Sequence, residues 1–182
     1  MGSHVCPWWF AYTFDNPFRT LFHKPDQLFA PYIREGMTVA DIGCGLGFFS
    51  IGLAQQVRQR GKVIALDIQQ KMLDGAEKRA IKAGVADIIE FRQCTGTDIN
   101  VTEPLDFALA FWMVHEVPDA ASLFKQIQNT LKPAGLLLVA EPKFHVSYSR
   151  FQQEVDSAKQ VGLSIKDEPK VMFSYAALFE KR

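Results

Sequence analysis

The sequence lacks a net charge, because its 20 Lys and Arg residues are balanced by 20 Asp and Glu residues. Binding to a nucleic-acid backbone depends on a positive field that neutralises phosphates and releases counterions. The basic residues form only short clusters, such as Lys78-Arg79 and Lys181-Arg182, which are typical of a solvated surface. We therefore expect no nucleic-acid partner.

Long apolar runs and paired cysteines are also missing. No apolar run approaches the roughly 18–20 residues that a membrane-spanning helix requires, and no basic segment followed by an apolar one marks a secretory signal. The three cysteines, Cys6, Cys44 and Cys94, are widely spaced, which argues against a disulfide framework or a metal site. We expect a cytoplasmic protein without a membrane partner or a bound metal. The oligomeric state is left open.

The sequence does contain regularly alternating strand and helix patterns. Strands are expected at residues 38–43, 62–67, 88–93, 105–111 and 136–142. Helices are expected at residues 48–60, 71–83, 119–131 and 147–161. Near-continuous apolar strands separated by helices predict an α/β, Rossmann-like, doubly wound and mostly parallel sheet. Two further strands, at residues 164–167 and 173–180, predict a C-terminal antiparallel hairpin. Gly61 and Gly84 are expected to end their helices in the left-handed conformation.

The strongest motif is VADIGCGLGFFS at residues 39–50, where a strand leads through three glycines into a helix. Glycine allows the sharp turn there and lets a ligand approach the backbone, so the motif predicts a nucleotide-cofactor loop. A dinucleotide loop would carry a third glycine at Phe48, and Asp41 would repel its pyrophosphate. The same carboxylate would attract a cationic sulfonium-bearing amino acid. The charges therefore favour S-adenosylmethionine over a nicotinamide cofactor.

A second acidic residue, Asp67, ends the next expected strand, about twenty residues beyond the glycine loop. A carboxylate at this place accepts hydrogen bonds from the two hydroxyl groups of a ribose. It could also cap the following helix, and the two roles are compatible. We predict the ribose role for Asp67.

From about residue 31 to residue 179 the sequence resembles the class I S-adenosylmethionine-dependent methyltransferase family. The resemblance is carried by VADIGCGLGFFS, VIALDIQ, FRQCTGTDI, LDFALAFWMVHEV and LKPAGLLLVAEP. It implies a seven-stranded sheet with a reversed last strand, and methyl transfer by direct displacement to a small-molecule or lipid-like acceptor. A cofactor-binding sensor or partner subunit without turnover is the alternative, since a fold alone does not establish an activity.

The resemblance also assigns roles to individual residues. It implies that the glycine loop holds the methionine moiety, that Asp41 holds water or the amino group, and that Asp67 holds the ribose. Around the adenine and the transferable methyl it implies a further set of residues. The predicted cofactor-binding residues are Tyr12, Asp41, Gly43, Cys44, Gly45, Gly47, Asp67, Ile68, Cys94, Thr95 and Phe111. Cys44 and Cys94 are expected to act as small side chains rather than as nucleophiles.

Two histidines follow the strands that would border the acceptor. His115 and His145 are candidates for a general base, although a histidine in such a place can also be structural. Methyl transfer to a soft or already anionic acceptor needs no base.

The N-terminal residues 1–30 differ from the remainder, residues 31–182, which we predict to be the methyltransferase domain. Five aromatic residues lie within residues 8–14, which exceeds what a structural cap requires. We interpret this segment as a lid over the cofactor and acceptor, or else as part of the core, with Tyr12 able to reach the methionine carboxylate. Residues 1–4 are given no function.

Overall fold

The computed structural model describes residues 22–182. The predictions that concern Tyr12, Cys6 and the aromatic residues 8–14 lie outside the described residues. The division into an extension of residues 1–30 and a domain of residues 31–182 stays a prediction. Among residues 22–182, no helix is long and apolar enough to cross a membrane.

Seven strands form one sheet in the order β3-β2-β1-β4-β5-β7-β6. The strands are β1 (Thr38–Ile42), β2 (Lys62–Asp67), β3 (Ile89–Gln93), β4 (Leu105–Phe111), β5 (Leu131–Pro142), β6 (Leu163–Asp167) and β7 (Ser174–Lys181). Strands β1 to β5 run parallel to one another, whereas β7 is antiparallel to both β5 and β6. The predicted doubly wound sheet with a C-terminal antiparallel hairpin is confirmed.

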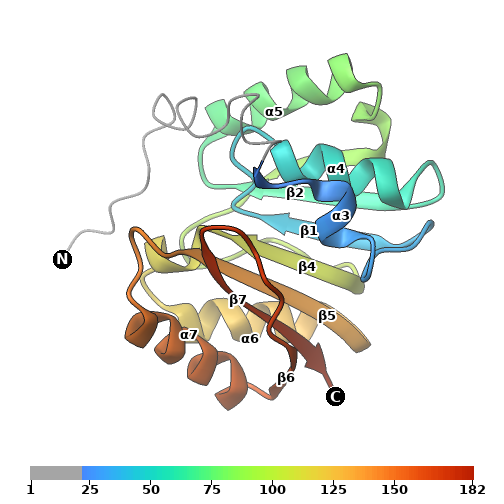
Figure 1. The fold of residues 1–182 in the computed structure, drawn as a ribbon. Coiled ribbons are helices and arrows are strands. Elements are labelled where there is room, and N and C mark those ends of the chain that lie inside the picture. The colour runs from blue at the N-terminus through green and yellow to red at the C-terminus, as the bar shows by residue number, and fades with distance from the viewer. Residues whose placement is uncertain (1–21) are drawn as a thin grey trace.

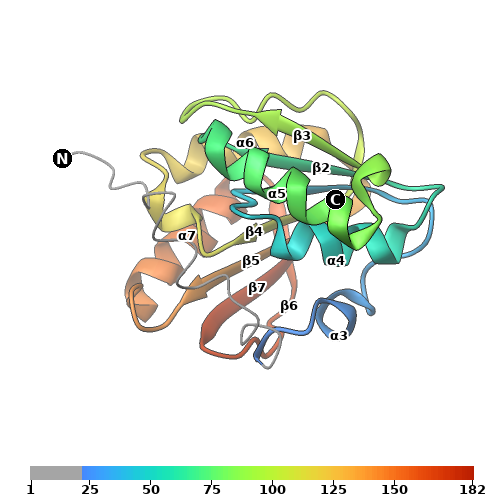
Figure 2. The same ribbon diagram turned by 90° about the horizontal axis from the view of Figure 1, so that it is seen from above.

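Helices cover both faces of the sheet, as Figures 1 and 2 show. The helices are α3 (Pro25–Phe29), α4 (Phe48–Val57), α5 (Gln70–Ala83), α6 (Ala120–Thr130) and α7 (Tyr148–Gln160), with 3-10 turns η1 (Ala86–Ile88) and η2 (Val114–Glu116). α3, α4 and α5 lie on one face, and α6 and α7 on the other. Each face buries its own apolar cluster, one around Phe29, Leu53 and Phe107 and one around Phe124 and Phe179. The central strands β1, β2 and β4 are therefore apolar on both sides, which explains their uninterrupted hydrophobic runs.

The order of the strands fixes the position of a ligand site. From β1 the chain proceeds outward to β2 and β3, and then returns to place β4 on the other side of β1. A crevice opens at the carboxyl ends of strands where the order reverses in this way. The loops after β1 and β4 therefore border the expected site.

Two local predictions were wrong. α4 ends at Val57, where Arg58 adopts φ 57°, so Gly61 is not the helix stop. Gly61 instead permits close packing, because a Cβ there would lie 2.8 Å from the carbonyl oxygen of Met37. Gly84, in contrast, adopts φ 70° as predicted.

The second correction concerns the start of β5. This strand begins at Leu131, directly after α6, rather than at residue 136. Leu131 is buried and pairs with Leu105, and the pairing with β4 shifts its register before it resumes between Phe107 and Leu136. Pro133 lies inside this irregular stretch, where a missing backbone donor is tolerated.

Candidate functional site

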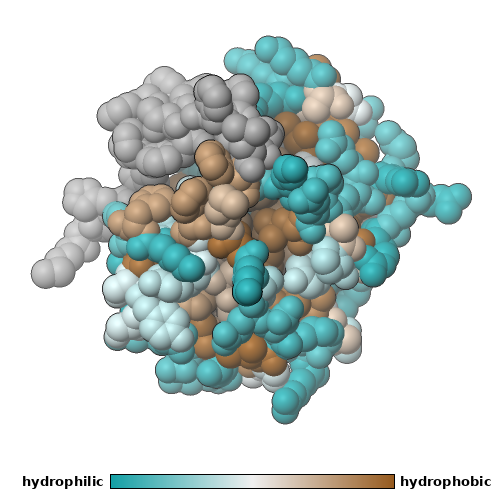
Figure 3. Space-filling view, in the orientation of Figure 1, coloured by the Kyte–Doolittle hydropathy of each residue, from teal (hydrophilic) through white to brown (hydrophobic). Residues whose placement is uncertain are grey.

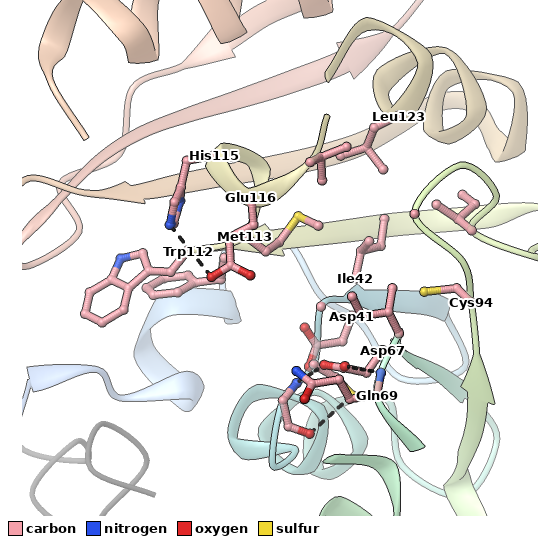
Figure 4. A pocket seen from close by; sticks show the side chains of 18 of the residues that line it. Asp41, Ile42, Asp67, Gln69, Cys94, Trp112, Met113, His115, Glu116 and Leu123 are labelled. Carbon is pink, nitrogen blue, oxygen red and sulfur yellow. Dashed lines mark hydrogen bonds and ion pairs between the residues drawn. The ribbon is translucent and has the colours of Figure 1, made fainter. Parts of the chain in front are cut away.

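A cavity of about 680 Å³ opens at the carboxyl ends of β1, β2 and β4. Its volume is within the roughly 300–1,000 Å³ that is usual for small-molecule and cofactor sites. In Figure 4, Asp41 and Asp67 lie at one end of the cavity and His115 lies at the other. The predicted site residues that line it are Asp41, Gly43, Cys44, Gly45, Asp67, Ile68, Cys94, Thr95, Phe111, His115 and His145.

The glycine loop turns tightly between β1 and α4. The amides of Gly43 and Cys44 both donate to the carbonyl oxygen of Leu66 at 2.8 Å, which anchors the loop to the end of β2. Gly43, Gly45 and Gly47 all have positive φ angles. A Cβ built at Gly45 meets no atom of the described residues within 4 Å, and Gly45 lines the cavity. The loop thus leaves its backbone accessible to a ligand.

Gly47 has a supporting rather than a lining role. It precedes the first residue of α4 with φ 76°, and a Cβ there would lie 2.8 Å from the Cβ of Ala76 on α5. The missing side chain therefore lets α5 pack against the loop.

Asp41 is buried, and one of its carboxylate oxygens accepts a hydrogen bond from the hydroxyl of Ser50 at 2.6 Å. Ser50 belongs to the first turn of α4. The positive end of this helix, which would hold a pyrophosphate in a dinucleotide-binding protein, is therefore close to a carboxylate. This arrangement disfavours a phosphate and is compatible with an ammonium group.

Asp67 joins the glycine loop to the start of α5. Its Oδ2 accepts the amide of Gly45 at 3.0 Å, and its Oδ1 accepts the amide of Gln69 at 2.9 Å. Burial raises the pKa of this carboxyl, and the backbone hydrogen bonds oppose that shift. Each oxygen has a further lone pair, so the carboxylate can hold a ribose as well as the turn. Both roles predicted for Asp67 are therefore compatible with the geometry.

The loop after β3 lies beside Asp67, since the amide of Cys94 donates to the Asp67 carbonyl at 3.1 Å. Thr95 lines the cavity, but its hydroxyl accepts the amide of Asp98 at 3.0 Å within the loop. Asp98 also lines the cavity and was not predicted. It lies three residues beyond Thr95 in the FRQCTGTDI segment, so an acidic side chain close to the predicted position could have been noticed in the sequence.

The cysteines are not poised for nucleophilic attack. Burial raises the pKa of the Cys44 thiol well above its usual value, and the carboxylates of Asp41 and Asp67 raise it further. Burial and Asp67 together raise the pKa of the Cys94 thiol to about 11. Since the thiolate is the nucleophile, both residues serve as small side chains of the wall, in line with the prediction.

The residues after β4 form an aromatic wall. Phe111 packs against Phe49 with a ring-centroid distance of 4.3 Å, and Trp112 packs against Phe111 at 5.4 Å. The indole of Trp112 donates to the hydroxyl of Ser174 at 2.8 Å, which ties this wall to β7. Met113 lies over the glycine loop, 2.9 Å from where a Cβ of Gly43 would be. This side of the cavity suits a flat or apolar molecule.

His115 and His145 face each other, with ring centroids 4.9 Å apart. His115 lies in η2 directly after β4, whereas His145 follows β5. The Nδ1 atom of His115 hydrogen-bonds to Glu141, a fully buried residue of β5 that was not predicted. Among residues 22–182, no group of three or more His, Cys, Asp or Glu side chains is arranged to hold a metal ion.

The fold and the site together define a class of α/β protein that binds a nucleoside-containing cofactor at the switch point of its sheet. Residues 33–176 match the family described as "Methyltransferase domain", so the chain belongs to the methyltransferase domain family. The family and the fold identify S-adenosylmethionine as the cofactor.

Solved structures and curated protein sequences that are similar to this chain also include methyltransferases. The crystal structure of a SAM-dependent methyltransferase from Aquifex aeolicus superposes with a TM-score of 0.87 at 21% identity, covering 98% of this chain and all of that one. A demethylmenaquinone methyltransferase of Lactobacillus johnsonii is 34% identical over 110 residues, which are 60% of this chain and 45% of the relative. A ubiquinone biosynthesis O-methyltransferase of Leptothrix cholodnii is 28% identical over 141 residues, which are 73% of this chain and 57% of the relative. The chain thus spans about half the length of these curated relatives.

The buried carboxyl group of Glu154 on α7 leads to a prediction about the stability of the fold. Glu154 of α7 is buried, its Oε1 lies 3.8 Å from the Arg150 guanidinium, and its Oε2 has no hydrogen-bond partner among residues 22–182. Burial, with the charge of Glu141, raises the pKa of Glu154 to about 7. A raised pKa stabilises the fold below the ordinary carboxyl pKa, and this contribution is lost as the pH rises through about 7.

We therefore expect Glu154→Gln to be more stable than the unmodified protein at pH 8, by about 1–2 kcal/mol after allowing for water access. The difference should shrink at pH 5, where the carboxyl is protonated in the folded state. Urea unfolding at both pH values measures it, with the exposed Glu77→Gln variant expected to stay within about 0.5 kcal/mol of the unmodified protein. A difference of equal size at pH 5 and pH 8 would contradict this account.

Proposed function

We propose that this protein transfers a methyl group from S-adenosylmethionine to a small, lipid-like acceptor of the quinone type. The observation that carries the proposal is the composition of the cavity. Its one end combines an accessible glycine backbone with the buried carboxylates of Asp41 and Asp67, and its other end is aromatic. One end thus suits a charged nucleoside, and the other suits a flat, apolar ring.

The residues at the first end fit the cofactor. Gly45 leaves room for the methionine moiety, Asp41 can accept from its ammonium group, and Asp67 can accept from the ribose hydroxyls. Ile68 lies next to Asp67 on the cavity wall, and Asp98 offers a carboxylate on the adenine side. When bound, S-adenosylmethionine supplies a methyl group on an electrophilic sulfonium.

The residues at the second end would hold the acceptor. Phe111 and Trp112 form a wall against which a ring can stack, and Phe144 lines the cavity while remaining 65% exposed. On the face shown in Figure 3, hydrophobic residues are visible near the centre between hydrophilic side chains. An apolar tail attached to the acceptor ring could pack against the exposed ring of Phe144 at the edge of the cavity. Of the two curated relatives described above, one is named for demethylmenaquinone and the other for ubiquinone biosynthesis, which supports this acceptor class.

Transfer of labelled methyl tests the proposal. The protein is incubated with methyl-labelled S-adenosylmethionine and a panel of prenylated benzohydroquinones and naphthohydroquinones, and the label is followed into the organic phase. We expect label in at least one quinol, with little in a short polar phenol of the same ring size, because the aromatic wall favours an apolar acceptor. If the protein bound S-adenosylmethionine tightly but transferred no label to any quinol or to a component of a cell extract, the alternative of a cofactor-binding sensor or partner subunit without turnover would be favoured.

A further inference from the structure

A buried carboxylate holds one nitrogen of His115. Glu141 lies at the end of β5 with its side chain fully buried. Its Oε1 accepts the amide of Val114 at 2.9 Å, and its Oε2 hydrogen-bonds to Nδ1 of His115. The backbone contact keeps the carboxylate in place beside the ring.

This pairing sets which ring nitrogen carries the proton. A carboxylate only accepts hydrogen bonds, so Nδ1 of the neutral imidazole is the protonated nitrogen and Nε2 keeps its lone pair. The Nε2 atom lies 4.0 Å from Oε1 of Glu116, beyond hydrogen-bond distance. Both His115 and Glu116 line the cavity, as Figure 4 shows. The ring is therefore held in the form that can receive a proton at Nε2.

The surrounding charges are those of Glu116, Glu141, Arg150 and Glu154, with His145 against the ring. Burial works to lower the pKa of His115, but the hydrogen bond and charge of Glu141, together with Glu116, raise it above its ordinary value. Arg150 opposes this shift, and its guanidinium donates to the His115 carbonyl at 2.5 Å. A raised pKa makes the imidazole a stronger base toward a weakly acidic group.

We propose that the acceptor presents an ionisable ring hydroxyl to His115, that His115 is the general base, and that Glu141 is a positioning residue. This rests on the proposed methyl transfer. The hydroxyl proton moves to Nε2, the oxygen's electron pair forms the new O–CH₃ bond, and the C–S bond breaks with its electron pair moving to sulfur. The products are a methyl ether, S-adenosylhomocysteine and one proton, which the imidazolium later releases to water.

The need for a base follows from the acidity of the acceptor. A phenolic hydroxyl has a pKa of about 10, so only a small fraction is ionised at neutral pH. A positioned base contributes roughly 10²- to 10⁴-fold to such a step. An aromatic thiol is already largely anionic at pH 8 and needs no base. The two kinds of acceptor therefore separate the role of His115 from that of the cofactor site.

The state of the ring can be measured without turnover. Long-range ¹H–¹⁵N spectra of the intact protein, assigned with His115→Asn, should show a protonated Nδ1 and an unprotonated Nε2 above the pKa of His115. Glu141→Gln keeps an oxygen for the Val114 amide, but its amide group can donate to Nδ1 and so place the proton on Nε2. The matched variant Glu116→Gln should leave Nδ1 protonated. An Nε2-protonated ring in the unmodified protein would overturn the proposal.

Transfer to two probes completes the test: a prenylated catechol, and an aromatic thiolate of similar size at pH 8. His115→Asn should lower kcat for the catechol roughly 10²- to 10⁴-fold with little change in KM, and leave methylation of the thiolate within about threefold. Glu141→Gln should lower kcat for the catechol roughly 10- to 100-fold. The acid limb of the catechol pH profile should disappear in His115→Asn.

The outcomes separate this inference from the proposed function. Equal loss on catechol and thiolate would show a structural role for His115 and would overturn the inference alone. If the unmodified protein methylated the thiolate but no hydroxyl probe, the inference about His115 would be overturned, whereas the proposed methyltransferase function would stand. No transfer to any probe would overturn both.

Discussion

Asp67→Ala is expected to weaken binding of S-adenosylmethionine by about 2–4 kcal/mol, or roughly 30- to 800-fold in Kd. The carboxylate is buried at the cavity wall, and its oxygens face both the Gly45 amide and the open site. Its removal takes away the charge-assisted hydrogen bonds to the ribose. The amides of Gly45 and Gln69 also lose their acceptor and would hydrogen-bond to water instead. The sheet should remain folded, because those amides border the cavity rather than the core.

Calorimetric titration measures the effect, and two variants separate its causes. Asp67→Asn keeps one acceptor oxygen but no charge, so its loss should be intermediate. Asp156→Ala removes an exposed carboxylate on α7, far from the cavity lining, and should leave the affinity unchanged. An unaltered Kd in Asp67→Ala would show that the residue serves only the turn into α5.

The second large effect is expected on stability. Gly47→Ala places a Cβ 2.8 Å from the Cβ of Ala76 while φ is 76°. The left-handed conformation costs a residue with a Cβ about 1–2 kcal/mol, and overpacking adds about 1–3 kcal/mol. The sum corresponds to a fall in melting temperature of roughly 4–20 °C for a chain of this size. Cofactor binding should weaken too, since α5 and the glycine loop must separate.

Gly84→Ala is the matched control for this change. Gly84 has φ 70°, but a Cβ there meets no atom within 4 Å, and the residue lies outside the cavity lining. It should lose only the backbone contribution, about 1–2 kcal/mol, with cofactor affinity retained. Equal destabilisation of the two variants would mean that the contact between Gly47 and Ala76 carries no weight in packing α5.

The parts of this molecule that sequence reasoning predicted are those where neighbours along the chain determine the structure. The apolar runs indicated the central strands β1, β2 and β4, and the glycines with Asp41 marked the cofactor loop within a dozen residues. Asp67 was found because a carboxylate at a strand end has a characteristic local setting. In each case the physical constraint acts over a short stretch of chain.

The sequence-based predictions were wrong or incomplete where contacts between distant parts of the chain determine the role of a residue. Glu141 pairs with His115 across 26 residues, and only the parallel alignment of β4 and β5 brings them together. Asp98 lies in a loop with no periodicity to indicate which way its side chain points. A Cβ at Gly61 would meet both the side chain of Val57 at the end of α4 and the carbonyl oxygen of Met37 before β1, so the glycine serves close packing and its helix-stop pattern was misleading.

Calorimetric titration of the unmodified protein with S-adenosylmethionine and, separately, with NAD tests the central claim most directly. The claim rests on the open glycine loop, on the Asp41 carboxylate beside the first turn of α4, and on Asp67 at the place expected for the ribose. S-adenosylmethionine should bind at a single site, and NAD should give no saturable heat, because its pyrophosphate would meet the Asp41 carboxylate. Saturable binding of NAD together with no binding of S-adenosylmethionine would contradict this account.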